Sequence, residues 1–212
     1  MTKIDLQVLK PFGPSIAKII IPKDIVSALN NYVDQLIIDT KKTKELSAGA
    51  DLAGDVTQEF KLEKEFSEKS GWLELISKAT FQWIKMTLKK DIKEFKMIDS
   101  WIVRQFQNEY NPVHMHSGHI SGAGFLKVPK TLGKYVQEEK HGVKDYVGGT
   151  LNLIHGSKQF LSNSNFKIVP QVGDFYFFPH YLMHTVYPFK GTDEERRSIS
   201  FNAKIDESIF SL

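Results

Sequence analysis

The chain has 212 residues, 41% of them hydrophobic and 12% aromatic, and its 28 basic and 25 acidic residues leave a net charge of +3. This length fits one domain with a sizeable core, and the weak charge gives no argument for a specific nucleic-acid partner. The absence of cysteine excludes disulfides, thiolate metal sites and cysteine nucleophiles. The sequence has neither the apolar core of a signal peptide nor the roughly 18 apolar residues of a membrane span, so we expect a soluble cytoplasmic protein.

The first part of the chain predicts two strands and two helices. Residues 4–21 have the pattern strand, Pro/Gly turn, strand. Residues 23–40 and 72–95 place apolar side chains at helical spacing, whereas residues 41–70 are rich in Lys, Glu, Ser, Ala and Gly. We therefore expect two helices joined by an exposed connection.

From about residue 98 the pattern changes to short apolar or aromatic runs separated by Gly, Pro and Asn. The predicted strands are 98–107, 113–116, 120–128, 149–155, 166–169, 174–178, 183–187 and 197–205. Many short strands without helices between them are typical of an antiparallel sandwich or barrel. The predicted fold is mainly β, a jelly roll with N-terminal helices packed on one sheet. We expect residues 1–212 to form a single domain, with an N-terminal strand and helical support over 1–97 and the jelly-roll core over 98–205.

Two histidines two residues apart, His114 and His116, indicate a metal site. In an extended segment such residues point to the same face, because side chains alternate. His184, from a distant strand, completes a set of three ligands on one face of a metal, which leaves the other face open. This arrangement is typical of a mononuclear non-haem iron oxygenase.

A carboxylate usually stands where His116 is found, since the common oxygen-activating iron site has two histidines and one carboxylate. Asp145 lies in a predicted loop and Asp174 at a strand start, and neither has the right relation to His114. Three histidines are therefore the simpler interpretation. This neutral set leaves the iron more positive than the common triad does.

The other four histidines are better explained without a metal. His119 falls on the opposite strand face from His116 unless Ser117 and Gly118 form a bulge. The remaining three fit a solvated loop, a strand end and a turn; they are His141, His155 and His180.

Arg196 and Ser198, twelve and fourteen residues after His184, have the spacing of a carboxylate clamp. Guanidinium binds a carboxylate with two hydrogen bonds, and a hydroxyl on the same strand face adds a third. Asn202 continues this face and joins the candidate cofactor-binding residues. Arg197 lies on the other face, and we expect it at the surface.

These segments resemble a known family. In chain order they are His114-Met-His116, Ile120-Ser-Gly-Ala-Gly-Phe-Leu, Gly148-Gly-Thr-Leu, Gly173-Asp-Phe-Tyr-Phe-Phe-Pro, His184-Thr-Val-Tyr-Pro and Arg196-Arg-Ser-Ile-Ser-Phe-Asn202. Together they resemble the 2-oxoglutarate/Fe(II)-dependent oxygenases of phage and marine bacterial genomes, distant relatives of prolyl hydroxylases. The resemblance covers about residues 98–205 and, more loosely, 51–59.

The resemblance implies a double-stranded β-helix that binds Fe(II), 2-oxoglutarate and O2. Arg196 would hold the terminal carboxylate of 2-oxoglutarate, and the enzyme would hydroxylate an unactivated C–H bond with release of succinate and CO2. The primary substrate, a peptide side chain or a small molecule, would be selected by loops such as 41–70 and 130–147. A phage-encoded enzyme would act in the host cytoplasm.

Two alternatives stay open on the sequence alone. A cupin-type metalloprotein also carries His-x-His in a barrel strand, and it could be a cosubstrate-free dioxygenase, an isomerase or a small-molecule binder. The pair Arg196 and Ser198 favours the oxygenase, because a cupin does not need it. A purely structural jelly roll would leave the histidines and the arginine unexplained.

Overall fold

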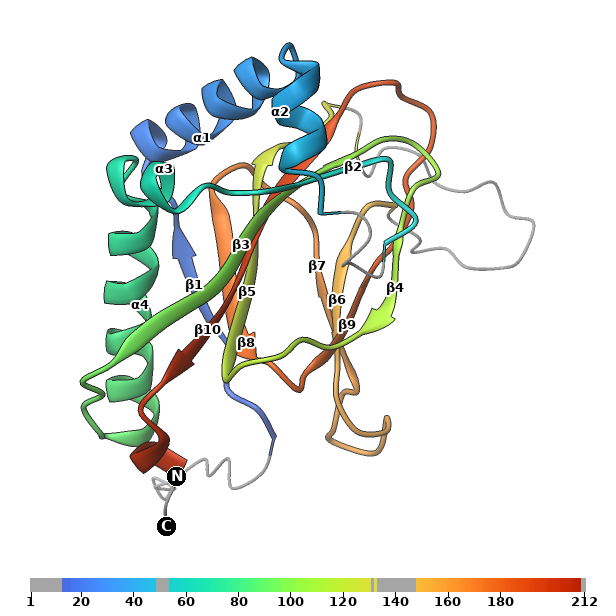
Figure 1. The fold of residues 1–212 in the computed structure, drawn as a ribbon. Coiled ribbons are helices and arrows are strands. Elements are labelled where there is room, and N and C mark those ends of the chain that lie inside the picture. The colour runs from blue at the N-terminus through green and yellow to red at the C-terminus, as the bar shows by residue number, and fades with distance from the viewer. Residues whose placement is uncertain (1–12, 49–53, 131, 133–147, 211–212) are drawn as a thin grey trace, which may run out of the picture.

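The structure, a computed structural model, describes residues 13–48, 54–130, 132 and 148–210 (Figure 1). In chain order the elements are β1 (Ala17–Ile20), α1 (Lys23–Leu36), α2 (Thr40–Glu45), β2 (Gln58–Lys61), α3 (Lys64–Lys69), α4 (Trp72–Leu88), β3 (Phe95–Gln105), β4 (Asn111–His114), β5 (Ile120–Lys127), β6 (Leu151–Ile154), β7 (Asn165–Ile168), β8 (Asp174–Pro179), β9 (Met183–Val186), β10 (Arg196–Ile205) and a 3-10 turn (Glu207–Phe210). None of the described helices is long and apolar enough to cross a membrane.

The strands form two antiparallel sheets, as the sequence predicted. The larger sheet has the order β1-β8-β5-β10-β3-β2 and the smaller one β4-β9-β6-β7. The helices α1 and α4 lie along the outer face of the larger sheet, while the smaller sheet lies on its other side (Figure 1). This is the expected jelly roll with N-terminal helices on one sheet.

Alternation along β8 divides the interior into two cores. Phe175 and Phe177 face the helices and belong to the cluster that contains Trp72 of α4. Tyr176 and Phe178 face the other way, into the space between the two sheets. Because both faces of β8 are covered, its run of aromatic residues is buried throughout rather than alternately exposed.

The space between the helices and the larger sheet is tightly packed. A Cβ at Gly122 of β5 would lie 2.6 Å from Phe175 and 2.7 Å from Phe201, closer than real side chains approach. Glycine at this position therefore allows two aromatic rings to lie directly on the β5 backbone.

The prediction for residues 41–70 was wrong, because this segment is not merely an exposed connection. It contains α2, the edge strand β2 and α3, and the β2 residues Glu59 and Phe60 are almost fully buried. The predicted helices also end early. The side chain of Asp39 accepts hydrogen bonds from the backbone of Lys41 and Lys42 and starts a new helix, and Lys89 ends α4 in a left-handed conformation.

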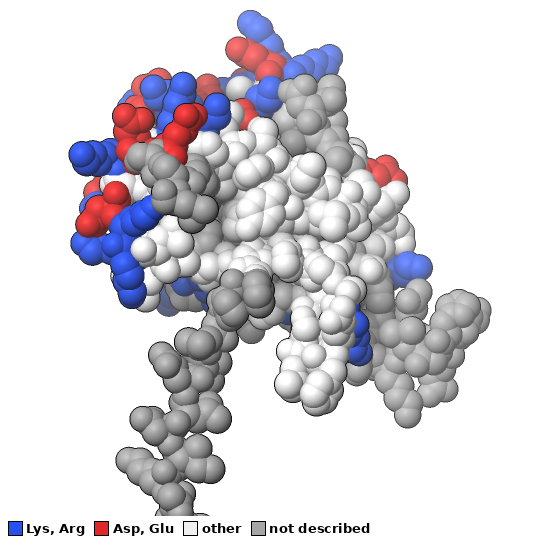
Figure 2. Space-filling view, turned by 90° about the horizontal axis from the view of Figure 1, so that it is seen from below, with Lys and Arg blue, Asp and Glu red and all other residues white. Residues whose placement is uncertain are grey.

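Charged side chains are unevenly distributed over the surface. In the view from below, Lys, Arg, Asp and Glu gather on the side where α4 lies, and few are seen over the middle of this face (Figure 2). On α4 they form pairs such as Lys78 with Glu74, four residues apart. This pattern is typical of a solvated helix surface.

Candidate active site

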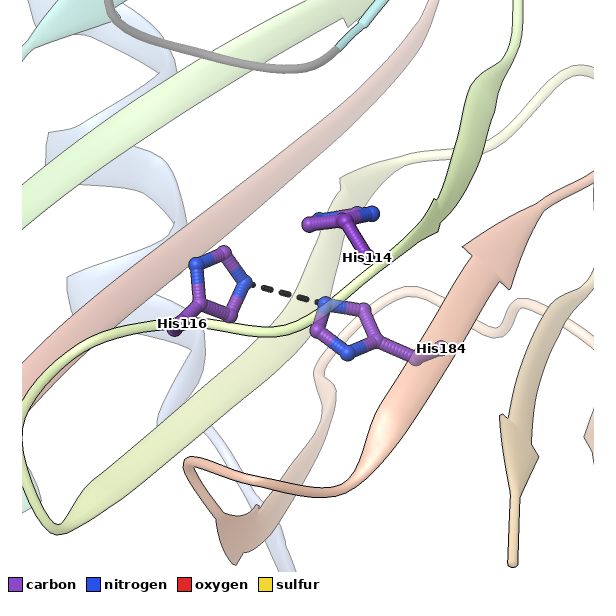
Figure 3. Close-up of side chains that lie close together, drawn as sticks. All are labelled: His114, His116 and His184. Carbon is purple, nitrogen blue, oxygen red and sulfur yellow. Dashed lines mark hydrogen bonds between the residues drawn. The ribbon is translucent and has the colours of Figure 1, made fainter.

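Three histidines meet between the two sheets (Figure 3). His114 ends β4, His116 follows two residues later, and His184 lies on β9 directly opposite His114. One ring nitrogen from each lies within 4.8 Å of the others, and Nε2 of His116 is 2.9 Å from Nε2 of His184. The structure thus brings together the three residues that the sequence singled out.

Backbone carbonyls fix how two of these rings are protonated. Nδ1 of His114 lies 2.7 Å from the carbonyl oxygen of Pro112, and Nδ1 of His184 lies 3.0 Å from that of Leu182. A carbonyl oxygen only accepts hydrogen bonds, so each Nδ1 carries the proton and each Nε2 keeps its lone pair. Such an outer hydrogen bond is the usual way in which a metal-binding histidine is oriented.

The environment keeps the three rings neutral. Burial lowers the pKa of His116 to about 3 and that of His184 to about 4, and each is lowered further by a neighbouring histidine. Burial lowers the pKa of His114 as well. All three are therefore uncharged at neutral pH, which is the form of imidazole that binds metals.

The donor set fits an iron ion. Nitrogens in adjacent positions around a metal, each at about 2.1 Å from it, lie about 3 Å apart, close to the separation of the two Nε2 atoms. Imidazole is a good ligand for iron, and three ligands on one side leave positions open on the other. The site can therefore hold a metal and still admit further ligands.

The other described histidines do not join this cluster. Nδ1 of His119 lies 3.1 Å from the backbone of Ile205, His155 lies at a strand end, and His180 contacts the backbone of His119 in a turn, as the sequence suggested. His141 and Asp145 lie outside the described residues. The carboxylate of Asp174 pairs with Lys18 at 2.7 Å and does not belong to the cluster.

A cavity beside the three rings, here called the histidine cavity, contains the predicted clamp residues. Its walls include His114, His116, His184, Arg196, Ser198, Ser200, Trp101, Val103, Asn111, Phe125 and Phe178. Arg196, Ser198 and Ser200 are alternate residues of β10, so they share the strand face that looks between the sheets. Arg196 therefore points into the space between the sheets, as expected.

The guanidinium of Arg196 is buried without a charged partner. Its side chain is 2% exposed, Nη1 donates to Oε1 of Gln105, and the group lies 5.1 Å from the ring centre of Phe125. Nε has no hydrogen-bond partner, and no carboxylate in the described residues pairs with it. Burial lowers its pKa to about 9. A buried cation of this kind is suited to a carboxylate ligand.

Arg197 does not lie at the surface, so that expectation was wrong. It is 1% exposed and lies on the helix side of the sheet, where it donates to Glu195 at 2.6 Å and to Asp34 of α1 at 2.7 Å. It also donates to the backbone and side-chain oxygens of Asn30. Because α1 covers this face and supplies partners, Arg197 links the helix to β10.

Asn202 continues the strand face of Arg196 and Ser198, two residues beyond Ser200. It lines a second, more open cavity, here called the outer groove, with a volume of about 370 Å³. The residues of the outer groove are Ala48, Lys61, Asp99, Ser100, Trp101, Met115, His116, Ser117 and Asn202. Trp101 and His116 line both spaces, so the outer groove adjoins the histidine cavity at these two residues. Oδ1 of Asn202 accepts a hydrogen bond of 2.7 Å from Ser121.

Several residues that shape the site were not predicted from the sequence. Gln105 contacts Arg196, the ring of Trp101 lies 5.4 Å from that of His116, and the ring of Phe178 lies 5.0 Å from that of His184. Gln105 and Trp101 lie on β3, which pairs with β10, whereas Phe178 of β8 and His184 of β9 belong to different sheets. The missing signals were therefore strand pairing and the packing of the two sheets, neither of which is visible in the sequence.

Comparison with known proteins now identifies the class. Residues 99–202 match the sequence model of the family described as "Putative 2OG-Fe(II) oxygenase". These residues make up just under half of the chain and contain the three histidines as well as Arg196 and Ser198, and the match indicates a 2-oxoglutarate/Fe(II) oxygenase. This confirms the resemblance seen in the sequence and favours an oxygenase over a cupin-type protein. No curated protein matches the sequence.

Solved structures support the fold. A prolyl-4-hydroxylase from Pseudomonas putida has 16% identity, with 89% of this chain and 92% of that chain covered and a TM-score of 0.56. The viral collagen prolyl hydroxylase of Paramecium Bursaria Chlorella virus-1, in complex with 2OG, has 15% identity, coverage of 89% and 94%, and a TM-score of 0.52. A Trichoplax adhaerens prolyl hydroxylase, in complex with a hypoxia inducible factor peptide fragment, has 13% identity, coverage of 92% and 84%, and a TM-score of 0.54.

Proposed function

We propose that the chain hydroxylates an unactivated C–H bond, with Fe(II) held by His114, His116 and His184 and 2-oxoglutarate held by Arg196 and Ser198. The observation that carries this proposal is the meeting of three neutral histidines and an unpaired buried arginine in one cavity. Neither a structural jelly roll nor a metal site without cosubstrate needs that buried cation.

When bound, iron, 2-oxoglutarate and O2 supply the oxidising chemistry, with succinate and CO2 as coproducts. The residues of the chain then orient the reactants. Pro112 and Leu182 hold two of the rings through their carbonyl oxygens, and Arg196 with Ser198 binds the carboxylate distant from the metal. Phe125 and Phe178 keep this part of the cavity dry, which strengthens the charge pairing.

The primary substrate enters through the outer groove. This space meets the histidine cavity at Trp101 and His116 and carries both apolar and charged side chains, among them Met115, Lys61 and Asp99. A peptide side chain or a small molecule would fit such an opening, and one of the similar structures is a prolyl hydroxylase with a peptide fragment. Asn202, at the junction, would contact either cosubstrate or substrate.

The other parts of the proposal concern organisation and location. Residues 1–212 act as one domain, in which the helices support the larger sheet while the catalytic residues come from 98–205. The cytoplasm is the proposed compartment, and the lack of cysteine fits a reducing environment.

Anaerobic loading tests the proposal. Protein with one equivalent of Fe(II) should develop a visible metal-to-ligand charge-transfer band when 2-oxoglutarate is added, and air should then give succinate. A screen of peptides and amino acids for stimulated succinate release would identify the substrate. If folded, iron-replete protein shows neither the band nor succinate, the cosubstrate-free cupin chemistry becomes the better explanation.

A further inference from the structure

Glu59 is a buried carboxylate beside the histidine cavity to which the proposed reaction gives no role. It lies on β2 directly opposite Val103 of β3, and Val103 lines the histidine cavity. Directly opposed residues of an antiparallel pair point to the same side of a sheet. The side chain of Glu59 is therefore directed between the two sheets, toward the metal ligands, and not toward the helices.

No charged partner among the described residues explains the burial of this carboxylate. Glu59 is 2% exposed, and the polar group nearest to it is the side-chain amide of Asn111, which leaves the carboxylate without a full set of hydrogen bonds. Gly54 covers it closely, since a Cβ there would lie 3.2 Å from Oε1 of Glu59 and would collide with the side-chain amide of Asn111. Burying a carboxylate without a compensating charge is costly, so such a group is rarely kept unless another charge or a proton joins it.

The groups around Glu59 favour its protonated form. Burial is the main reason that its pKa is raised to about 7, the nearby amide of Asn111 opposes the shift, and Glu109 adds to it. Lys61 lies two residues further on the same strand face. Arg104, one residue from Val103, lies on the other face, where it pairs with Glu195 at 2.8 Å.

Within the part of the chain that the structure describes, no carboxylate joins the three histidines to balance the charge of a metal. The three candidate ligands are neutral histidines, whereas the common iron site includes one carboxylate. Arg196 adds another positive charge to the same cavity. A divalent ion held by three imidazoles would therefore leave an excess of positive charge between the sheets.

We propose that Glu59 is the outer carboxylate of this site and balances the charge of a divalent metal bound to the three histidines. It acts across Asn111, whose side chain touches Glu59 and lines the histidine cavity. Glu59 is thus a positioning and charge-balancing residue, not a ligand. This inference rests on the proposed function, because it requires the histidines to bind a metal.

The proposal predicts that a proton leaves when the metal enters. In the metal-free protein burial raises the pKa of Glu59 to about 7, so this carboxyl group is partly protonated at neutral pH. A divalent ion nearby favours the carboxylate, and the proton passes from Glu59 to the buffer. Binding at pH 7 should therefore release about half a proton per metal ion, the fraction expected for a group with a pKa near the pH.

Anaerobic calorimetry measures this directly. Fe(II) alone is titrated into the full-length protein at pH 7, in two buffers that differ in ionisation enthalpy, so that the difference in heat gives the number of protons released. The Glu59→Gln variant should release none and bind Fe(II) more weakly, by about tenfold or more, the usual loss when an outer partner is removed. Its metal-free form should be as stable as the wild type or more so, because an unpaired charge has been removed.

Glu68→Gln provides the matched control, since Glu68 is an exposed carboxylate on α3. It should behave as the wild type. Unchanged affinity and proton release in Glu59→Gln would overturn the inference and leave the metal site standing. A loss of metal-free stability in Glu59→Gln would also overturn it, by assigning Glu59 a structural role. Wild-type protein that binds no Fe(II) would overturn the proposed function itself, and this inference with it.

Discussion

The Arg196→Met variant tests whether Arg196 serves to bind the cosubstrate and not to stabilise the fold. The substitution keeps most of the buried stem and removes the charge. It should weaken 2-oxoglutarate binding by about 2–5 kcal/mol, or roughly 30-fold to several thousand-fold, the range for losing one partner of a desolvated charge pair. The metal-free protein should not lose stability, because the fall of the pKa from 12.5 to about 9 on burial corresponds to a cost of about 5 kcal/mol for the charged form.

Arg197→Met should have the opposite effect. Arg197 bonds to Glu195 at 2.6 Å and to Asp34 at 2.7 Å, and its removal leaves Glu195 with less compensation in a buried position. Breaking a buried pair in this way costs about 3–5 kcal/mol, and we expect the lower end because Arg104 still pairs with Glu195. Where the variant remains folded, its 2-oxoglutarate affinity should stay close to that of the wild type.

Two measurements check the pair of variants. Equilibrium urea unfolding of the metal-free proteins gives the free energy of unfolding, and anaerobic titration of the charge-transfer band gives the affinity for 2-oxoglutarate. If Arg196→Met binds 2-oxoglutarate normally while a stable Arg197→Met does not, the assignment of the clamp is wrong.

Four further outcomes are expected. His184→Ala should no longer bind one Fe(II) per chain in anaerobic metal analysis. His116→Asp should still bind it, because a carboxylate recreates the commoner ligand set. Iron retained in His184→Ala would contradict the assignment of His184 as a ligand. Burial opposes ionisation of Glu195, but hydrogen bonds from its two arginine partners outweigh it and lower its pKa to about 2. Glu195→Gln should therefore reduce the free energy of unfolding by about 3 kcal/mol at pH 7. This loss of stability should shrink as the pH falls from 4.5 toward 2, because the paired carboxylate stabilises the fold only while it is ionised. A loss that does not change with pH would refute this explanation. Gly122→Ala should lower the free energy of unfolding by about 1–3 kcal/mol, since the added methyl group would collide with Phe175 on the helix side of the sheet. Its Fe(II) affinity should not change. A large loss of metal binding would contradict the idea that this side of the sheet serves stability and not the metal site.

Most of the strands and the grouping of the three histidines could be predicted because the relevant signals are local. A two-residue period places His114 and His116 on one face without any tertiary information. The same rule separates Arg196 from Arg197, and Gly or Pro punctuation marks the strand ends. Only the third histidine, His184, needed a long-range inference, and the motifs around it supplied that.

Non-local partners could not be predicted in the same way. The burial of Arg197 depends on Asn30 and Asp34, which come from a helix more than 160 residues away in the sequence. The strand β2 was missed because its four residues alternate weakly and gain their burial from non-local pairing with β3 on one side and from contact with the segment around Ser47 on the other. Glu59 was hidden for the same reason, since a glutamate in a polar segment normally indicates a solvated position.

The strand β10 shows how function and stability share one short segment. Its inner face carries Arg196 and Ser198, which face the histidine cavity, while its outer face carries Arg197 and Ile199, which hold the helices. A shift of one residue in register would exchange the two faces, placing the buried ion pair in the cavity and the clamp under α1. Pairing with β3 on one side and β5 on the other fixes the register, so the packing of the helical layer also determines which arginine is available to a ligand.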